Sequence, residues 1–133
     1  MEPSGPPPKF FGPILVAARF DQTLAFYRDA LGLPFEGEAP YARCTAGPSR
    51  FGIVEAGFWA KVHGSDMQVH PGTLLPPSTI LALEVEDLDA RVERLLMRGV
   101  PFLTMPATHP EVGRRNAFLR DPDGRTVELA TRV

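Results

Sequence analysis

Apolar residues recur at helical spacing in two separate stretches of the chain. The first stripe consists of Phe20, Leu24, Tyr27 and Leu31. The second consists of Leu88, Val92, Leu95 and Leu96. A glycine, Gly32 or Gly99, follows each stripe and provides the usual signal for the end of a helix. The pattern therefore predicts two amphipathic helices whose apolar stripes are buried in a core.

The two halves of the chain repeat one order of signals. Residues 14–35, "ILVAARFDQTLAFYRDALGLPF", and residues 81–102, "LALEVEDLDARVERLLMRGVPF", each begin with a short apolar strand. An acid-bearing helix start, the amphipathic helix, its glycine stop and a further strand come next. We interpret this pattern as an internal duplication.

Three strand signals follow each predicted helix. In the first half they are "LPFEG", "YARCTA" and "RFGIVEAGFW", and in the second half "VPFLTM", "RNAFLRD" and "RTVELAT". Asp123 and Gly124 mark a tight turn between the last two. The sequence predicts an α+β fold of two βαβββ modules in a single domain of residues 1–133. Module one spans about residues 12–58, a crossover about 59–78, and module two about 79–133. Each sheet would hold its helix on one face and leave the other to line a cavity.

Composition and charge narrow the possible partners and the compartment. The chain has 133 residues, 44% hydrophobic content and a net charge of -2 without runs of like charge, so neither nucleic acid nor a membrane surface is an expected partner. Cys44 is the only cysteine and is interpreted as a packed thiol. No stretch approaches the roughly 18 apolar residues of a membrane span. The opening "MEPSGPPPKFFG" does not read as a signal peptide, which predicts a cytoplasmic protein.

The repeated helix segments and the terminal "DPDGRTVEL" resemble the vicinal oxygen chelate superfamily from about residue 12 onward. This superfamily includes glyoxalase I, extradiol dioxygenases, and fosfomycin and bleomycin resistance proteins. The resemblance implies that the two modules form a half-open barrel, often completed by a partner chain in a homodimer. In metal-using members, the first and last strands of each module contribute one ligand position each to a divalent ion.

In this chain the four implied positions are Gly12, Ile80, Glu55 and Glu128. The first two side chains cannot ligate, and two carboxylates without nitrogen ligands suit zinc, nickel or ferrous iron poorly. Magnesium or manganese could still use two glutamates and water. We therefore expect no cofactor, with a divalent metal at Glu55 and Glu128 as the alternative.

Alternation along the last strands predicts which side chains face the cavity. Val127 and Leu129 would face the helix and Glu128 the cavity, and the same rule places Ile53 and Glu55 inside. Glu128 would then either serve a ligand or be neutralised by a nearby arginine. The candidate arginines are Arg115, Arg120 and Arg125.

The crossover and one loop add further candidates. Residues 56–79, "AGFWAKVHGSDMQVHPGTLLPPST", read as a long irregular loop. The resemblance to bleomycin-resistance-like members implies that Phe58 and Trp59 stack on planar cationic drugs in an acidic groove. Alternatively, these aromatics seal the join between the modules. His109, beside Glu111 in "ATHPEVGRRN", is a candidate acid or base near pH 7.

Three classes of function follow. The favoured one is a metal-independent small-molecule binding protein of the glyoxalase/bleomycin resistance type, for which the resemblance implies antibiotic resistance by sequestration. Its candidate ligand-binding residues are Glu55, Glu128, Trp59, Phe58 and His109. The alternatives are a metal-dependent lyase, isomerase or dioxygenase that uses Glu55 and Glu128, and a non-catalytic dimeric subunit. Expected partners are a small molecule and a second copy of the chain.

Overall fold

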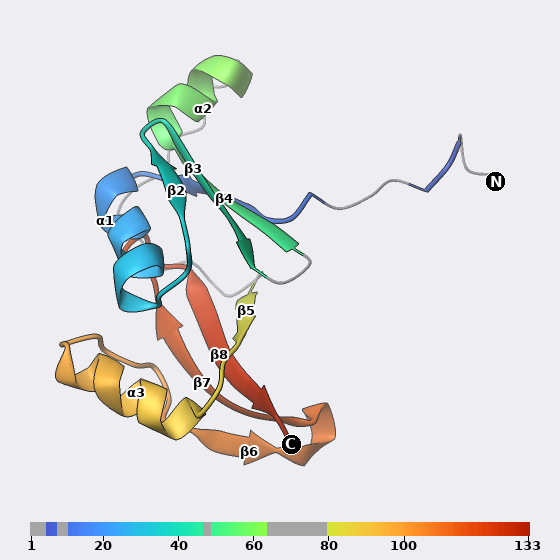
Figure 1. Ribbon diagram of the computed structural model, residues 1–133, viewed down its shortest axis with the longest axis vertical. Helices are drawn as coiled ribbons and strands as arrows, with labels where there is room; N and C mark the ends of the chain where they lie inside the picture. The colour runs from blue at the N-terminus through green and yellow to red at the C-terminus, as the bar shows by residue number, and fades with distance from the viewer. Residues whose placement is uncertain (1–4, 8–10, 47–48, 64–79) are drawn as a thin grey trace. The chain divides into compact units, whose positions relative to one another are not determined.

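The structure, a computed structural model, describes residues 5–7, 11–46, 49–63 and 80–133 (Figure 1). The chain divides into two compact units, residues 1–69 and 70–133. Each unit contains one four-stranded mixed sheet with a helix between its first and second strands. The predicted α+β fold with two βαβββ modules is confirmed.

The first unit runs through β1 (Ile14–Ala17), α1 (Phe20–Ala25), the π-helical turn η1 (Phe26–Ala30), β2 (Glu36–Glu38), β3 (Tyr41–Ala46), β4 (Ser49–Glu55) and α2 (Ala56–His63). Its strand order is β1-β4-β3-β2, with β1 parallel to β4 and the other pairs antiparallel. The parallel pair requires a crossover between its strands, and α1 with β2 and β3 supplies it.

The second unit repeats this plan with β5 (Ile80–Glu84), α3 (Leu88–Met97), β6 (Ala107–His109), the 3-10 turn η2 (Pro110–Val112), β7 (Arg114–Arg120) and β8 (Thr126–Arg132). The order is β5-β8-β7-β6, and the single parallel pair is again first strand with last. The strand order of the two sheets is therefore the same.

Two of the predicted elements are wrong in type. Residues 100–105 form no strand of the sheet: Phe102 makes one isolated bridge to Leu119, and the amides of Leu103 and Thr104 both donate to the Phe118 carbonyl. The edge strand is β6 instead.

Residues 56–63, predicted as loop, form helix α2, because the prolines and most of the glycines that favour a loop come after His63. Residues 64–79 of the crossover lie outside the described part.

The helix stripes fill the core of each unit, with one exception. All four residues of the first stripe are buried, and the Tyr27 ring packs against Phe51 of β4 at 5.2 Å between centroids. This helix ends as its glycine predicts: Gly32 has φ 79°, and the Leu33 amide donates back to the Tyr27 carbonyl. In the second stripe Leu96 is 42% exposed, so α3 buries three of the four predicted residues.

Each sheet ends on one side in a strand of only three residues. β2 carries Glu36 and Glu38 around Gly37, and β6 lies between Pro106 and Pro110. Charges and prolines at these positions leave little regular backbone available for pairing on that side of each sheet.

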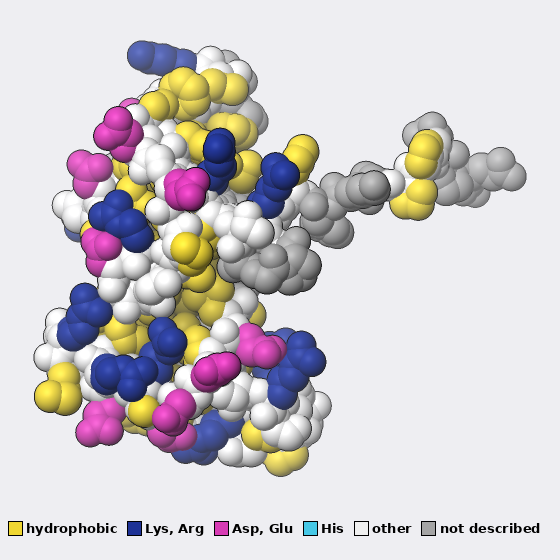
Figure 2. Space-filling model, viewed as in Figure 1, with side chains coloured by type: hydrophobic (Ala, Val, Ile, Leu, Met, Phe, Trp, Pro, Cys, Tyr) yellow, Lys and Arg dark blue, Asp and Glu magenta, His cyan; other side chains and the backbone are white. Residues whose placement is uncertain are grey.

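The viewed face carries both signs of charge interspersed, without a large area of one sign (Figure 2). None of the helices in the part of the chain described here is long and apolar enough to cross a membrane.

Candidate functional site

Among the described residues, α1 and η1 cover one face of the first sheet and leave its other face, called here the helix-free face, uncovered. Phe51 contacts Tyr27, so Phe51, Ile53 and Glu55, which alternate along β4, belong to the helix-covered face. Gly52 belongs to the opposite face. The expectation that Ile53 and Glu55 line a cavity on the helix-free face is therefore wrong.

Strand register explains the error. The first helices of the two units begin at residues 20 and 88, an offset of 68 residues that also relates Ile14 to Ala82 (82 − 14 = 68). Ile14 pairs with Gly52, and Ala82 pairs with Glu128. Gly52 is thus the structural counterpart of Glu128. Glu55 lies three positions further on, and an odd shift along a strand moves a side chain to the other face.

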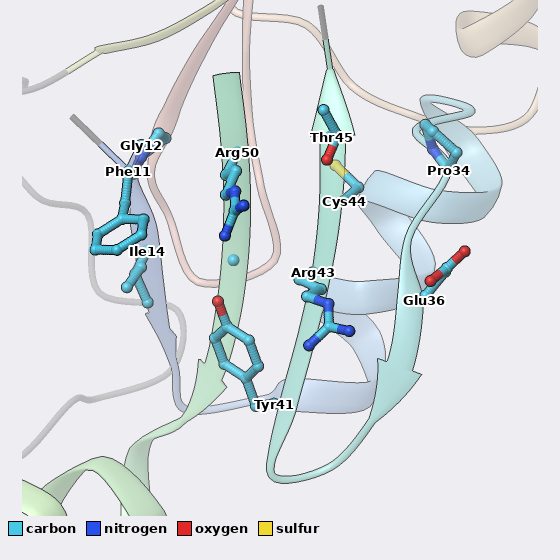
Figure 3. Close-up of a pocket in the computed structure, with 12 residues that line it drawn as sticks. Phe11, Gly12, Ile14, Pro34, Glu36, Tyr41, Arg43, Cys44, Thr45 and Arg50 are labelled. Atoms are coloured by element: carbon cyan, nitrogen blue, oxygen red, sulfur yellow. The ribbon is translucent and has the colours of Figure 1, made fainter. Parts of the chain in front are cut away.

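The helix-free face of the first sheet carries a cleft of about 820 Å³ (Figure 3). Its aromatic and charged lining residues are Phe11, Glu36, Tyr41, Arg43 and Arg50. Apolar lining comes mainly from the segment that leads into β1 and from Ile14. None of the five predicted ligand-binding residues lines this cleft.

Gly52 lies at the floor of the cleft beneath Tyr41. A Cβ atom at Gly52 would lie 2.6 Å from the Tyr41 hydroxyl and 3.0 Å from its ring, so the tyrosine covers the place of the missing side chain. Figure 3 shows the Arg50 side chain and the Tyr41 hydroxyl pointing toward one another along β4. Gly12 is required next to β4, because a Cβ there would lie 1.7 Å from the Arg50 carbonyl oxygen.

The cleft carries more positive than negative side chains. Among the described residues, neither Arg43 nor Arg50 makes an ion pair with an acid, and the Arg50 guanidinium lies 5.7 Å from the centroid of the Phe11 ring. Glu36 is the one acid in the lining, and its side chain points away from Arg43 in Figure 3. The acidic groove expected from the resemblance is not what this face presents.

Glu128 in the second unit is buried and neutralised within its own sheet. Val127 and Leu129 pack toward the core, and Glu128 faces the opposite side as predicted. Its Oε1 accepts a hydrogen bond from Arg114 Nη1 at 2.9 Å, and its Oε2 accepts one from Asn116 Nδ2 at 2.8 Å. An arginine does neutralise Glu128, but it is none of the three predicted.

Those three arginines are engaged elsewhere. Arg115 lies on the other face of β7 and forms a two-pronged pair with Asp89 of α3, which lowers the pKa of the Asp89 carboxyl and raises the pKa of Arg115. Arg125 pairs with Asp121 in the "DPDG" turn, and Arg120 donates to a carbonyl of the same turn. Each therefore supports a helix contact or the hairpin rather than Glu128.

The remaining predicted site residues fall into two places. His109 pairs with Arg114 across β6 and β7, so it shares the sheet face of Glu128, and its Nδ1 lies 3.5 Å from Glu111 Oε1. Phe58 and Trp59 lie on α2, where Phe58 is exposed and Trp59 half-buried. Their role in ligand binding stays a prediction.

The residues at the family's metal positions do not fit a divalent ion. With the corrected register these positions hold Gly12, Gly52, Ile80 and Glu128, which together supply a single carboxylate. Both of its oxygens already accept hydrogen bonds, one of them from a guanidinium. Within the described ranges no group of three or more His, Cys, Asp or Glu side chains is placed to hold a metal.

The sequence profile of the Glyoxalase/Bleomycin resistance protein/Dioxygenase superfamily matches residues 11–129, and the chain belongs to this superfamily. An uncharacterized protein of Bacillus subtilis (strain 168), YraH, is 29% identical over 118 residues, which cover 86% of this chain and 91% of the relative.

Two solved structures from Agrobacterium tumefaciens show the same fold. A protein of unknown function from strain C58 has a TM-score of 0.77 at 22% identity and covers 98% of both chains. A lactoylglutathione lyase has a TM-score of 0.68 at 21% identity and covers 95% of both chains.

Proposed function

We propose that this chain binds a small organic molecule in the cleft of the first sheet and does so without a catalytic metal. The observation that carries the proposal is the cleft itself, about 820 Å³ on the face of the sheet opposite the one that packs against Tyr27. Its size lies within the usual range for small-molecule sites, roughly 300–1,000 Å³. Apolar side chains and a few polar groups line it together, the usual composition of such sites.

Metal independence is supported by the surroundings of Glu128. A metal ion at this carboxylate would have to displace hydrogen bonds from Arg114 and Asn116 and then lie beside a guanidinium. The metal-dependent alternative also uses Glu55, which belongs to the helix-covered face of the first sheet. It therefore has less support than the binding function, although one similar structure is a lactoylglutathione lyase.

Binding is tested by adding a library of small organic fragments to ¹⁵N-labelled protein and following its amide resonances. We expect fragment-induced shifts at the amides of Arg43, Arg50 and Gly52. Ile14→Trp places a large side chain in the cleft and should abolish these shifts. Val62→Trp, at an exposed position on α2 outside the cleft lining, is the matched control and should leave them unchanged.

The same titrations distinguish the alternatives. Shifts that survive treatment with a chelator support a metal-independent site. Shifts or turnover that vanish with chelator and return with manganese or nickel would favour the metal-dependent enzyme. No binding by any fragment would favour a non-catalytic subunit. The homodimer and the cytoplasmic location stay predictions. Light scattering would measure the mass of the particle in solution and so show whether the chain is a homodimer.

A further inference from the structure

The two sheets differ at one equivalent position of their last strands, where the second sheet has a carboxylate and the first sheet has none. In the second sheet Glu128 carries it, and in the first sheet Gly52 stands at the same position. The residue that donates to Glu128 Oε2 is Asn116, which pairs with Ala130, two positions beyond Glu128. The residue that pairs two positions beyond Gly52 is Tyr41. Tyr41 is therefore the counterpart of Asn116.

The first sheet thus keeps a hydrogen-bond donor where it lacks the acceptor. The Tyr41 hydroxyl lies 2.6 Å from the point at which a side chain at Gly52 would begin. In the second sheet the matched donor is satisfied by the carboxylate of the chain itself. Nothing on β4 supplies that carboxylate in the first sheet, because Gly52 has no side chain.

Two arginines of the cleft lining lie next to Gly52 in the sheet. Arg43 is the direct cross-strand partner of Gly52, and Arg50 lies two residues before Gly52 on the same face. Arg43 and Arg50 are therefore diagonal neighbours across β3 and β4, about 7–8 Å apart and within reach of each other's long side chains. Within the described residues neither arginine makes an ion pair. Glu36 is the cross-strand neighbour of Arg43, but its side chain points away from Arg43. The Arg50 side chain and the Tyr41 hydroxyl therefore point toward one another above Gly52, and Arg43 lies beside them on the same face.

We propose that the carboxylate of a bound ligand lies beside the Tyr41 hydroxyl and accepts a hydrogen bond from it, as Glu128 does from Asn116 in the second sheet. The inference rests on the proposed function and narrows its ligand class to small carboxylic acids with an apolar body. The carboxylate would accept hydrogen bonds from Tyr41, Arg43 and Arg50, since guanidinium and carboxylate groups match in geometry. The apolar body would lie against Ile14 and Phe11, which line the same cleft.

The test compares two probes of equal shape, 2-naphthoate and the neutral 2-naphthamide, by amide shifts of the full chain. We expect naphthoate to bind at least about tenfold more tightly than naphthamide. A tenfold difference in Kd is the lower end of what one hydrogen bond to a charged group contributes. Arg43→Gln and Arg50→Gln should each reduce this preference. Arg132→Gln, which removes an exposed arginine outside the cleft lining, is the matched control and should not. Because the attraction is between exposed charges, added salt should weaken naphthoate binding selectively.

A second pair of variants supplies the missing group in the chain itself. Gly52→Glu introduces a carboxylate at the counterpart of Glu128, and Gly52→Gln introduces the same shape without the charge. Both displace the Tyr41 ring equally, so only the charge separates them. We expect Gly52→Glu to bind naphthoate more weakly than Gly52→Gln does.

Equal affinity of the wild type for naphthoate and naphthamide would overturn this inference and leave the proposed function standing. An unchanged preference in both arginine variants would also overturn it. If neither probe and no fragment of the library shifts the amide resonances, both the proposed function and this inference are overturned. The arginine variants keep the test valid if the Gly52 variants fold poorly, because both arginines are exposed.

Discussion

The two hydrogen bonds to Glu128 allow a comparison of two substitutions whose order of effect is not obvious. Arg114→Ala removes an ion pair, and Asn116→Ala removes a hydrogen bond from a neutral amide. The Arg114 side chain is 47% exposed, while Asn116 is 6% exposed. Glu128 is buried, but the Arg114 end of the pair is open to water, which can replace the lost donor; ion pairs screened by solvent contribute about 0–1 kcal/mol. Burial keeps water from replacing Asn116 as easily.

A hydrogen bond to a charged group in such a place contributes roughly 1.5–3 kcal/mol. We therefore expect Asn116→Ala to lower the free energy of unfolding by about 2 kcal/mol, and Arg114→Ala by less than about 1 kcal/mol. With a urea m-value of about 2 kcal/mol per molar, the first change moves the unfolding midpoint by about 1 M.

Urea unfolding followed by circular dichroism measures both midpoints. Arg132→Ala is the control, since it breaks an ion pair to Glu84 that is exposed on both sides and should cost almost nothing. A double-mutant cycle of Asn116→Ala with Glu128→Gln isolates the coupling between the two side chains. A larger loss for Arg114→Ala than for Asn116→Ala would refute the reasoning that burial outweighs formal charge here.

Three further predictions concern other buried or paired groups. Asp121→Ala should lower the free energy of unfolding by about 2–3 kcal/mol, measured by urea unfolding, because its buried carboxylate accepts two backbone amides and the Arg125 guanidinium. Burial raises the pKa of the Cys44 thiol, so a thiol reagent at pH 8 should label the native protein far more slowly than the protein in urea; equal rates would contradict this. Arg115 lowers the pKa of the Asp89 carboxyl. The pair therefore stabilises the fold at pH values above the ordinary pKa of aspartate, and this stabilisation is lost as the pH falls from that pKa toward the lowered one. Thermal unfolding of Asp89→Asn should accordingly show a shallower fall in stability between about pH 5 and pH 3 than the wild type shows.

The architecture could be predicted from the sequence because its signals are local. The helical stripe from Phe20 to Leu31 and its closing glycine specify a helix without knowledge of any partner, and the duplication supplies the second copy. Leu96 is the exception: its spacing is compatible with the buried stripe, but α3 buries a narrower face than the spacing allows.

The site was harder to predict because it depends on pairing between strands. Glu55 and Glu128 each follow a valine, and this local likeness hid a difference of three residues in register. The alternation in "YARCTA" contains the better signal: small or apolar residues, Ala42 and Cys44, are buried, while Tyr41 and Arg43 are exposed on the other side. The two-residue alternation of that strand alone identifies Tyr41 and Arg43 as residues of one face, and both line the cleft.

The partner of Glu128 follows from the same kind of reasoning. The turn at residues 121–124 sets Phe118 opposite Glu128, so residues an even number of positions from Phe118 share its face. Arg114 is four positions away and Arg115 three, which sends the first toward Glu128 and the second toward α3. Of the three predicted arginines, Arg115 is excluded because it lies an odd number of positions from Phe118 and therefore faces α3.

The brevity of β2 and β6 has a consequence for behaviour at high concentration. An unpaired strand edge is the template on which foreign chains add and fibrils grow. Three residues offer too few backbone groups for stable addition, and glutamates on β2 with prolines around β6 penalise it further. The chain is therefore protected on these two edges against strand-by-strand polymerisation. A substitution such as Glu38→Val, which removes a charge from that protection, is the kind expected to increase amyloid-dye fluorescence on prolonged incubation.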